Sequence, residues 1–195
     1  MKDLLVAVTG ASGMIYAERL LRAAAGQPLH VGLVITPEGA AIAAHELGWA
    51  IDFDKMQITG LPPEVESRVV LHHPGDLSSR YASGSAPPDA MVVVPCSVGA
   101  AGRMAAGLGS TLIARAAAVC LKERRPLVLV VREAPLSLID LRNLTALAES
   151  GAIVMPAAPP FYSRPESIEE LADFFVARVL DQVGIHLEHR GRWGG

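Results

Sequence analysis

Few residues of this 195-residue chain belong to the types that build disulfide-linked or metal-bound proteins. There are only two cysteines, Cys96 and Cys120, and they lie far apart without the spacing of a metal site. The six histidines include no His-x-x-x-His or Cys/His pairing. We therefore predict no metal site, and we expect both thiols to stay reduced and to pack as small core residues.

The sequence also lacks long apolar runs and a large net charge of either sign. No apolar stretch approaches the roughly 20 residues that a helix needs to span a bilayer. The start, Met1-Lys-Asp3, lacks the charged, apolar and small-residue regions of a secretory signal. The formal net charge of -3 gives no electrostatic reason to expect a nucleic acid or an anionic membrane as partner. We therefore expect a cytoplasmic protein that binds neither.

Aromatic residues are scarce at 5%, so alanine, valine and leucine supply most of the 51% hydrophobic content. That composition suits helices packed on a parallel sheet. Short apolar runs alternate with segments of helical periodicity, which predicts an α/β fold. We expect strands at 4–8, 30–35, 69–72, 91–95, 127–131 and 152–155, and helices at 14–25, 38–48, 99–106, 111–123, 139–149 and 167–184.

The sequence shows no internal repeat and no second domain. We predict one flavodoxin-like or Rossmann-like domain over residues 1–185, with three layers, a mostly parallel sheet and a long C-terminal helix. A polar tail at 186–195 follows it. Residues 51–63 contain Gly60 and two prolines and are expected to be irregular, while 75–88 are expected to form a long loop.

Two expected strands end in loops of small polar residues, Thr9-Gly-Ala-Ser-Gly13 and Pro95-Cys-Ser-Val-Gly99. Glycines permit close backbone approach, and free N–H groups at a helix start bind phosphate well. A dinucleotide fingerprint does not continue, because Tyr16 stands where a glycine would and the second strand ends in Thr36 instead of an acidic residue. The alternatives are a tight turn at the first loop and a helix-capping role for Ser97. A nucleophilic Ser97 is disfavoured, because it lacks the Gly-x-Ser-x-Gly elbow.

The strand at 127–131 runs directly into Arg132 and Glu133. Ligands in open α/β sheets bind beyond the carboxyl ends of strands, so these two side chains are candidates for chemistry. Lys122 is expected to reach toward the same strand end, supported by Arg115. The alternative for Arg115 is an ordinary ion pair with a carboxylate.

Two further polar side chains follow the last strand. Tyr162 closes a proline-rich segment, and its phenol either hangs over the crevice or packs at its rim. Arg178 lies among apolar residues of the final helix, where a cation needs either an acidic partner or a ligand. Together these residues suggest a crevice that binds an anion.

At this point the chain resembles the UbiX/Pad family of flavin prenyltransferases from about residue 4 to residue 185. Each of the matching segments is common alone, but their order and spacing together are highly specific. The segments are Thr9-Gly-Ala-Ser-Gly13, Ser83-Gly-Ser85, Pro95-Cys-Ser97, Leu121-Lys-Glu-Arg-Arg-Pro-Leu127, Arg132-Glu-Ala-Pro-Leu136, Gly151-Ala-Ile153, Pro160-Phe-Tyr162 and the helix bearing Arg178.

The resemblance implies an activity, a cofactor and partners. Members transfer a dimethylallyl group from dimethylallyl monophosphate to N5 and C6 of reduced FMN, without a metal. The prenylated flavin serves a UbiD-type decarboxylase. Members form homododecamers of flavodoxin-like subunits, with active sites at subunit interfaces.

The resemblance also assigns roles to residues of this chain. FMN would be bound by Gly10, Ala11, Ser12, Thr36, Ser97, Val98, Gly99, Ala100 and Arg132. The prenyl donor would be bound by Tyr162, Arg178, Lys122, Arg115 and Glu46, with Glu46 reaching in from a neighbouring subunit. Glu133 would assist proton removal, and Lys122, Tyr162 and Ser12 would complete the catalytic group. Thr36, Ala86, Ala100 and Ala134 depart from the family pattern, which affects fine contacts such as donor preference.

Two other functions remain open. An FMN-dependent cysteine decarboxylase shares the architecture, but it uses a catalytic histidine and an asparagine after the Pro-x-Ser segment, where this chain has Val98-Gly-Ala-Ala101. A non-catalytic flavin carrier would need neither Lys122 nor Glu133.

Overall fold

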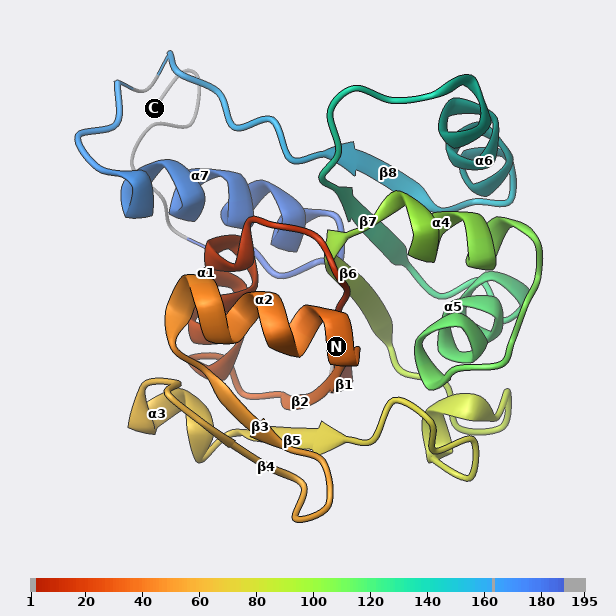
Figure 1. Cartoon of the computed structure of the whole chain (residues 1–195), viewed down its shortest axis with the longest axis horizontal. Helices are drawn as coiled ribbons and strands as arrows, with labels where there is room; N and C mark the ends of the chain where they lie inside the picture. Colours follow the sequence, from red (N-terminus) through yellow and green to blue (C-terminus); the bar gives the residue numbers. More distant parts are fainter. Residues whose placement is uncertain (1–2, 163, 188–195) are drawn as a thin grey trace.

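The computed structural model describes residues 3–162 and 164–187, and these form a six-stranded sheet with helices on both faces (Figure 1). All pairs of neighbouring strands are parallel, in the order β5-β2-β1-β6-β7-β8. Numbered along the chain, this is the doubly wound order 3-2-1-4-5-6. The strands are β1 Asp3–Val8, β2 His30–Ile35, β5 Val69–His72, β6 Ala90–Cys96, β7 Leu127–Val131 and β8 Ile153–Pro156. The predicted fold class is confirmed.

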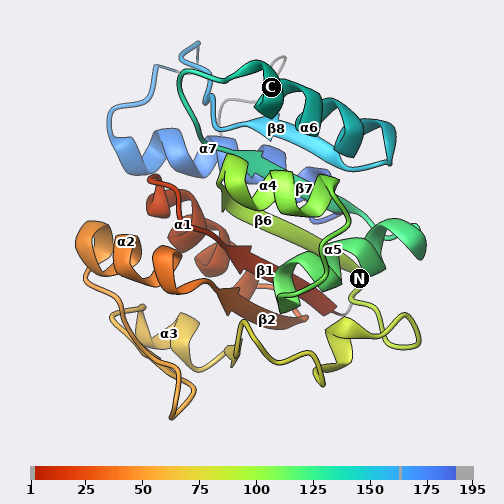
Figure 2. The ribbon, with the colours of Figure 1, turned by 45° about the vertical axis from the view of Figure 1, so that its right-hand side comes forward.

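The helices divide between the two faces of the sheet, as Figures 1 and 2 show. One face is covered by α1 Met14–Ala25, α2 Pro37–Leu47, α3 Pro63–Glu66 and α7 Ile168–Asp181. The other is covered by α4 Val98–Ala105, α5 Leu112–Lys122, α6 Leu138–Glu149 and the short 3-10 helix η1 Arg80–Ala82. Every expected strand and helix is present within one or two residues at its start; the last helix ends at Asp181, three residues before Gly184.

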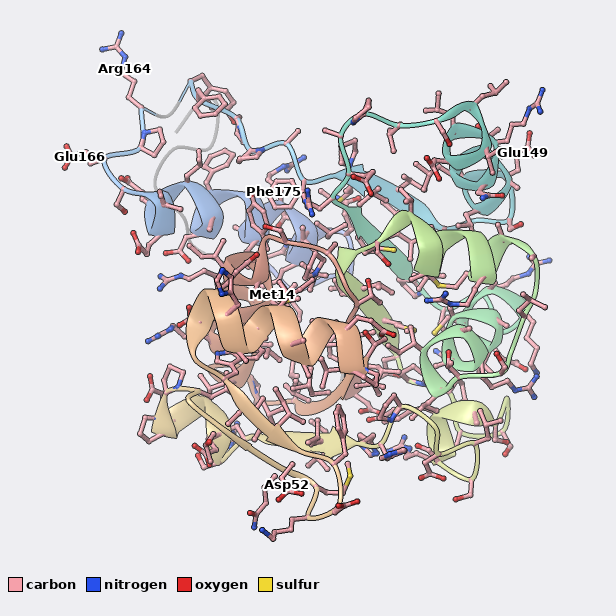
Figure 3. The ribbon with its side chains drawn as sticks, viewed as in Figure 1. Met14, Asp52, Glu149, Arg164, Glu166 and Phe175 are labelled. Carbon is pink, nitrogen blue, oxygen red and sulfur yellow. The ribbon has the colours of Figure 1, made fainter. Side chains whose placement is uncertain are left out.

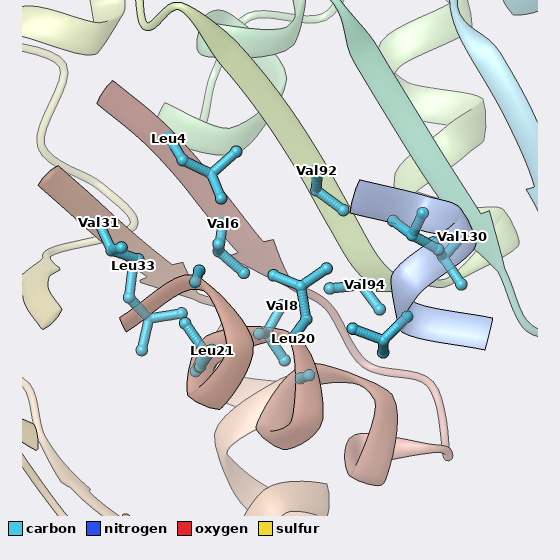
Figure 4. Close-up of a cluster of buried hydrophobic side chains, with 14 of the residues drawn as sticks. Leu4, Val6, Val8, Leu20, Leu21, Val31, Leu33, Val92, Val94 and Val130 are labelled. Carbon is cyan, nitrogen blue, oxygen red and sulfur yellow. The ribbon is translucent and has the colours of Figure 1, made fainter. Parts of the chain in front are cut away.

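The core forms because the central strands are apolar on both sides. Every residue of β1 is buried, and alternate residues enter different layers. Leu4, Val6 and Val8 pack against Leu20 and Leu21 of α1 (Figure 4). Across the sheet, Leu5 and Ala7 join the layer under α4 and α5. The two cysteines lie in or beside this second layer and are buried, which confirms their expected packing.

One expectation about local structure is wrong. Residues 51–63 include most of an antiparallel hairpin, β3 Ala50–Asp52 and β4 Gln57–Thr59. The Asp52 carboxylate accepts hydrogen bonds from the N–H groups of Asp54 (3.1 Å) and Lys55 (2.9 Å), which closes the turn. Strands of three residues are too short to show a period in the sequence.

Within the described residues, no helix is both long enough and apolar enough to cross a membrane. The same residues contain no group of three or more His, Cys, Asp and Glu side chains arranged to hold a metal ion. Of the predicted tail, 188–195 lie outside the described residues.

Candidate functional site

The candidate site lies at the carboxyl ends of β1 and β6, where the chain leaves neighbouring strands toward opposite faces of the sheet. After β1 it enters α1 on one face, and after β6 it enters α4 on the other. This divergence opens the crevice that binds ligands in doubly wound folds. The Thr9 hydroxyl donates to the Pro95 carbonyl (2.9 Å) and accepts from the Ser97 N–H (2.8 Å). Both polar loops predicted from the sequence therefore meet as one unit.

Two glycines of the first loop are required by its geometry. A Cβ on Gly10 would lie 2.7 Å from Cβ of Glu38, so only glycine lets the loop approach the first turn of α2. Gly13 has φ +100°, in the left-handed region that other residues rarely adopt. Gly13 also precedes α1 without supplying a capping side chain. The loop therefore leaves backbone N–H groups at the helix start free for an acceptor.

Glu46 of α2 fills that acceptor role. Its Oε2 accepts hydrogen bonds from the N–H groups of Gly13 (3.0 Å) and Met14 (2.8 Å). Partial burial acts to raise the pKa of Glu46, but hydrogen bonds from Ser12, Met14 and Gly13, with the charge of Arg132, hold that pKa below its usual range. Glu46, expected to reach in from another subunit, thus contacts the loop of its own chain. The start of α1 accommodates an anion.

The hydroxyls of Thr36 and Ser97 both cap helices. Thr36 Oγ1 accepts from the Gly39 N–H (3.0 Å) at the start of α2, and Ser97 Oγ accepts from the Ala100 N–H (3.2 Å) at the start of α4. The capping interpretation of Ser97 is confirmed. It does not exclude a ligand, because a capping hydroxyl accepts through its oxygen and keeps its hydrogen to donate.

Arg132, directly after β7, connects the end of that strand to the loop that follows β1. Its backbone N–H donates to the Cys96 carbonyl (3.1 Å), and its Nε donates to the Ser12 carbonyl (3.0 Å). The guanidinium is therefore held over the β1 loop, with its remaining N–H groups available to a ligand. The structure brings together the loops and side chains expected to bind FMN: Gly10, Ala11, Ser12, Thr36, Ser97, Val98, Gly99, Ala100 and Arg132.

Glu133 and Tyr162 also follow strand ends at this edge. Glu133 is exposed, and its Oε1 accepts from the Ala134 N–H at 3.0 Å. Tyr162 is 53% exposed and meets Phe174 of α7 edge-on, with ring centroids 5.6 Å apart. Phe175, the next residue of α7 (Figure 3), packs against Tyr16 of α1, with ring centroids 5.1 Å apart. The rim interpretation of Tyr162 is thus the one that a single chain shows.

Lys122 and Arg115 lie elsewhere. The expectation that Lys122 reaches the Arg132 strand end is wrong within one chain, because Lys122 precedes β7 and Arg132 follows it. The five residues of β7 span roughly 17 Å between them. Lys122 Nζ pairs with Glu123 Oε1 (2.7 Å) beside Gly84, and Arg115 Nε donates to the Ala82 carbonyl (2.9 Å).

Arg178 also lies away from the crevice. It pairs with Asp181 at 3.2 Å in the last turn of α7, which answers its need for an acidic partner. Gln182, four residues later, lines a groove with Leu121 and Pro126 at the amino edge of the sheet. Lys122 and Arg178, two of the cations expected to bind the prenyl donor, therefore lie toward the edge opposite the FMN residues.

A cleft of ≈ 290 Å³ opens beside the crevice, and its lining includes Thr9, Thr36, Glu38 and Ala100, which are described above. Its lining also contains Arg103 of α4, which sequence reasoning missed. A signal for it existed: Arg103 is the only charged residue in α4, whose sequence is otherwise small and apolar.

Comparisons with known proteins agree with this geometry. A family model described as Flavoprotein matches residues 1–180. A flavin prenyltransferase UbiX from Methanothermobacter thermautotrophicus is 40% identical over 195 residues, covering 100% of this chain and 97% of that protein. The crystal structure of AnUbiX (PadA1) in complex with FMN and dimethylallyl pyrophosphate gives a TM-score of 0.87 at 35% identity, covering 100% of this chain and 98% of that one. A dodecameric FMN-dependent UbiX-like decarboxylase from Escherichia coli O157:H7 gives 0.88 at 36% identity, covering 100% of both chains.

Proposed function

The chain belongs to the UbiX family of flavin prenyltransferases, and we propose that it transfers a dimethylallyl group from dimethylallyl monophosphate to N5 and C6 of reduced FMN. The observation that carries this proposal is the meeting of Thr9, Ser97 and Arg132 at one crevice, with helix N-termini around it. Neither alternative has comparable support. The relative with 40% identity is a flavin prenyltransferase, and the segment directly after Ser97 is Val98-Gly-Ala-Ala101, without an asparagine.

The residues present fit a phosphorylated flavin. Gly10 lets the first loop pack against the start of α2, and the hydroxyls of Thr36 and Ser97, which accept from their own helices, keep their hydrogens to donate to a ligand. Arg132 brings a guanidinium, which pairs well with phosphate or with polar ring atoms. Reduced FMN, when bound, supplies the electron-rich ring atoms that accept the allyl group.

The chain's own residues have three tasks in this reaction. Glu133 is positioned beside Arg132, where its carboxylate takes the proton released when the flavin ring closes on the prenyl group. Lys122, Arg178 and Tyr162 neutralise the departing phosphate, since a phosphate that leaves without a metal needs fixed cations and hydroxyl donors. Arg115 supports Lys122, while Ser12 and Glu46 hold the start of α1 in register with the flavin.

We propose that the donor residues and the flavin residues meet across subunits of a homododecamer. The Escherichia coli relative is dodecameric, and in a single chain Lys122 and Glu133 lie at opposite edges of the sheet. The first turns of α6 provide an apolar surface suited to a second copy, because Leu138 and Ile139 are 62% and 70% exposed. We place the enzyme in the cytoplasm, where a UbiD-type decarboxylase receives its product.

Incubation of the purified protein with reduced FMN and dimethylallyl monophosphate under anaerobic conditions tests the activity. Mass spectrometry of the flavin should show the gain of one dimethylallyl group. Absence of that gain, where a known homologue works, would exclude the function. A parallel reaction with dimethylallyl pyrophosphate, the ligand bound in AnUbiX, determines the preferred donor.

Glu133→Gln tests the catalytic role separately. The variant should bind FMN normally and turn over at least about tenfold more slowly. Glu149→Gln is the matched control, because Glu149 projects from the far end of α6 (Figure 3). Full activity of Glu133→Gln would remove Glu133 from the mechanism and would favour a role limited to binding.

A further inference from the structure

A cluster of ionisable side chains surrounds η1, and none of them is assigned to the flavin or to the prenyl donor. Asp3, at the start of β1, is 7% exposed, and its Oδ1 contacts His30 Nδ1 at 3.1 Å and the Tyr81 hydroxyl at 2.9 Å. Arg80 of η1 contacts the other carboxylate oxygen at 2.9 Å. The ring of His72, at the end of β5, meets the Tyr81 ring edge-on, with centroids 5.1 Å apart. Three strands and η1 thus gather two histidines near one buried carboxylate.

His72 holds one ring nitrogen in a place that suits only its neutral form. Its Nε2 is buried and has no hydrogen-bond partner among the residues that the structure describes. A neutral imidazole fits there, because it can carry its proton on Nδ1 and a lone pair on Nε2. A protonated imidazole has an N–H at both nitrogens, so its Nε2–H would be buried without an acceptor. The structure therefore favours a neutral His72.

Charges from the neighbouring elements act on His72 in both directions. His30 of β2 and Arg80 of η1 oppose its protonation, whereas Asp3 of β1 and Asp76, in the loop before η1, favour it. Burial is the largest effect, and the balance lowers the pKa of His72 below its ordinary value of 6.5. The closed form therefore binds fewer protons than an open form does. Its stability is complete above about pH 6.5 and is lost progressively as the pH falls below that value.

The residues that join this cluster to α5 are 73–82, here called the β5–η1 segment. At one end, the Pro74 carbonyl accepts from the N–H of Leu112, the first residue of α5, at 2.8 Å. At the other end, the Ala82 carbonyl accepts from Arg115 Nε at 2.9 Å. Opening of the segment therefore breaks two contacts of the helix that carries both α5 cations assigned to the donor. The flavin residues lie at the opposite edge of the sheet and keep their contacts.

We propose that His72 makes the β5–η1 segment an acid-responsive element, which opens when His72 takes up a proton from water and thereby loosens the donor half of the site. The consequence for the donor rests on the proposed function. The opening itself does not, because it depends only on the buried Nε2 and on the contacts of the segment.

Hydrogen exchange of the full-length, FMN-loaded protein, followed by mass spectrometry at about pH 7.5 and about pH 5.5, tests the opening. Protection factors remove the intrinsic pH dependence of exchange. Amides of 76–83 should lose about tenfold in protection in the wild type, which is the limit for one group whose open-state pKa is 6.5. Amides of α4, on the flavin side, should keep theirs.

His72→Phe keeps a ring beside Tyr81 and removes the titrating group, so the fall in protection should disappear. His72→Gln is the second variant and should behave alike if the phenylalanine variant folds poorly. His45→Gln, an exposed histidine in the last turn of α2, is the matched control and should keep the wild-type fall. The KM for dimethylallyl monophosphate should rise severalfold more on acidification in the wild type than in His72→Phe. Comparing the two proteins at each pH cancels ionisation of the substrate phosphate.

The outcomes separate the hypotheses. An equal fall in protection in the wild type and in both His72 variants, or no fall in the wild type, would overturn the acid-responsive element. A fall that depends on His72 but leaves the KM ratio unchanged would overturn its link to the donor half. Wild-type protein that makes no prenylated flavin would refute the proposed function, and the exchange experiment would still decide whether the segment opens.

Discussion

Tyr81 offers the sharpest test of how the fold supports the donor side of the site. Its side chain is fully buried, and its hydroxyl donates to Asp3 Oδ1 at 2.9 Å. Asp3, at the start of β1, is itself 7% exposed and also contacts Arg80 (2.9 Å) and His30 (3.1 Å). Burial, followed by the hydrogen bond to Asp3, raises the pKa of Tyr81. The hydroxyl therefore stays protonated and donates throughout the physiological pH range.

Tyr81→Phe removes this hydroxyl and leaves the ring in place. A buried hydrogen bond to a charged group contributes about 1.5–3 kcal/mol. We expect the free energy of unfolding to fall by that amount, because Asp3 loses a donor that water cannot replace at a buried position. For a chain of this size the melting temperature should fall by roughly 3–12 °C.

Thermal and urea denaturation measure the loss, with Tyr16→Phe as the matched control. Tyr16 is half-buried against Phe175, and its hydroxyl has no hydrogen bond to another described residue. Removing it should cost less than about 0.5 kcal/mol. Equal losses for the two variants would show that the Tyr81–Asp3 bond contributes nothing beyond ring packing.

The same variant has a functional consequence. Tyr81 anchors η1, and the next residue, Ala82, accepts the hydrogen bond from Arg115 Nε. A loosened η1 should raise the KM for the prenyl donor while the Kd for FMN stays constant, because FMN is assigned to the other edge of the sheet. A change in FMN affinity of the same size would refute this division.

Three further predictions concern single side chains. Gly10→Ala should lower the free energy of unfolding by about 1–3 kcal/mol and weaken FMN binding, since its Cβ would meet Glu38 at 2.7 Å; denaturation and flavin titration measure both. Burial raises the pKa values of Cys96 and Cys120 to about 12, so neither thiol should react with a disulfide reagent at pH 8 until the protein is unfolded. The pKa of Glu46 is lowered on folding, so its contribution to stability is present above about pH 4.5 and is lost as the pH falls below it; the difference in melting temperature between wild type and Glu46→Gln should shrink over that range.

The sheet could be predicted from the sequence because its strands are buried on both faces. Such strands appear as short continuous apolar runs, and 127–131 matches β7 residue for residue. The polar residues after each run could be predicted for the same reason, since parallel strands all end at one edge. Arg103 carried only a weak signal, as the one charged residue of α4, because a single cation on a helix most often faces solvent.

Other features depend on contacts that no local pattern contains. The hairpin at Ala50–Thr59 is held by its turn and by the burial of neighbouring Trp49, not by strand periodicity. Glu46 reaches the start of α1 across 32 residues of chain, and only the packing of α2 brings it there. The family resemblance identified Glu46 as a candidate site residue, and the structure shows that its carboxylate binds the N–H groups of Gly13 and Met14.

The position of Lys122 follows from the direction of α5. A helix that connects two parallel strands runs opposite to them, so its last residue lies at the amino edge, where the next strand begins. Lys122 and Arg132 are ten positions apart in the sequence, yet β7 separates them by its whole length. Because Lys122 and Arg132 are near in the sequence, they were expected to share one site, whereas the topology places them at opposite edges of the sheet. We propose that the donor half and the flavin half meet only when subunits assemble, which would tie catalysis to the oligomer.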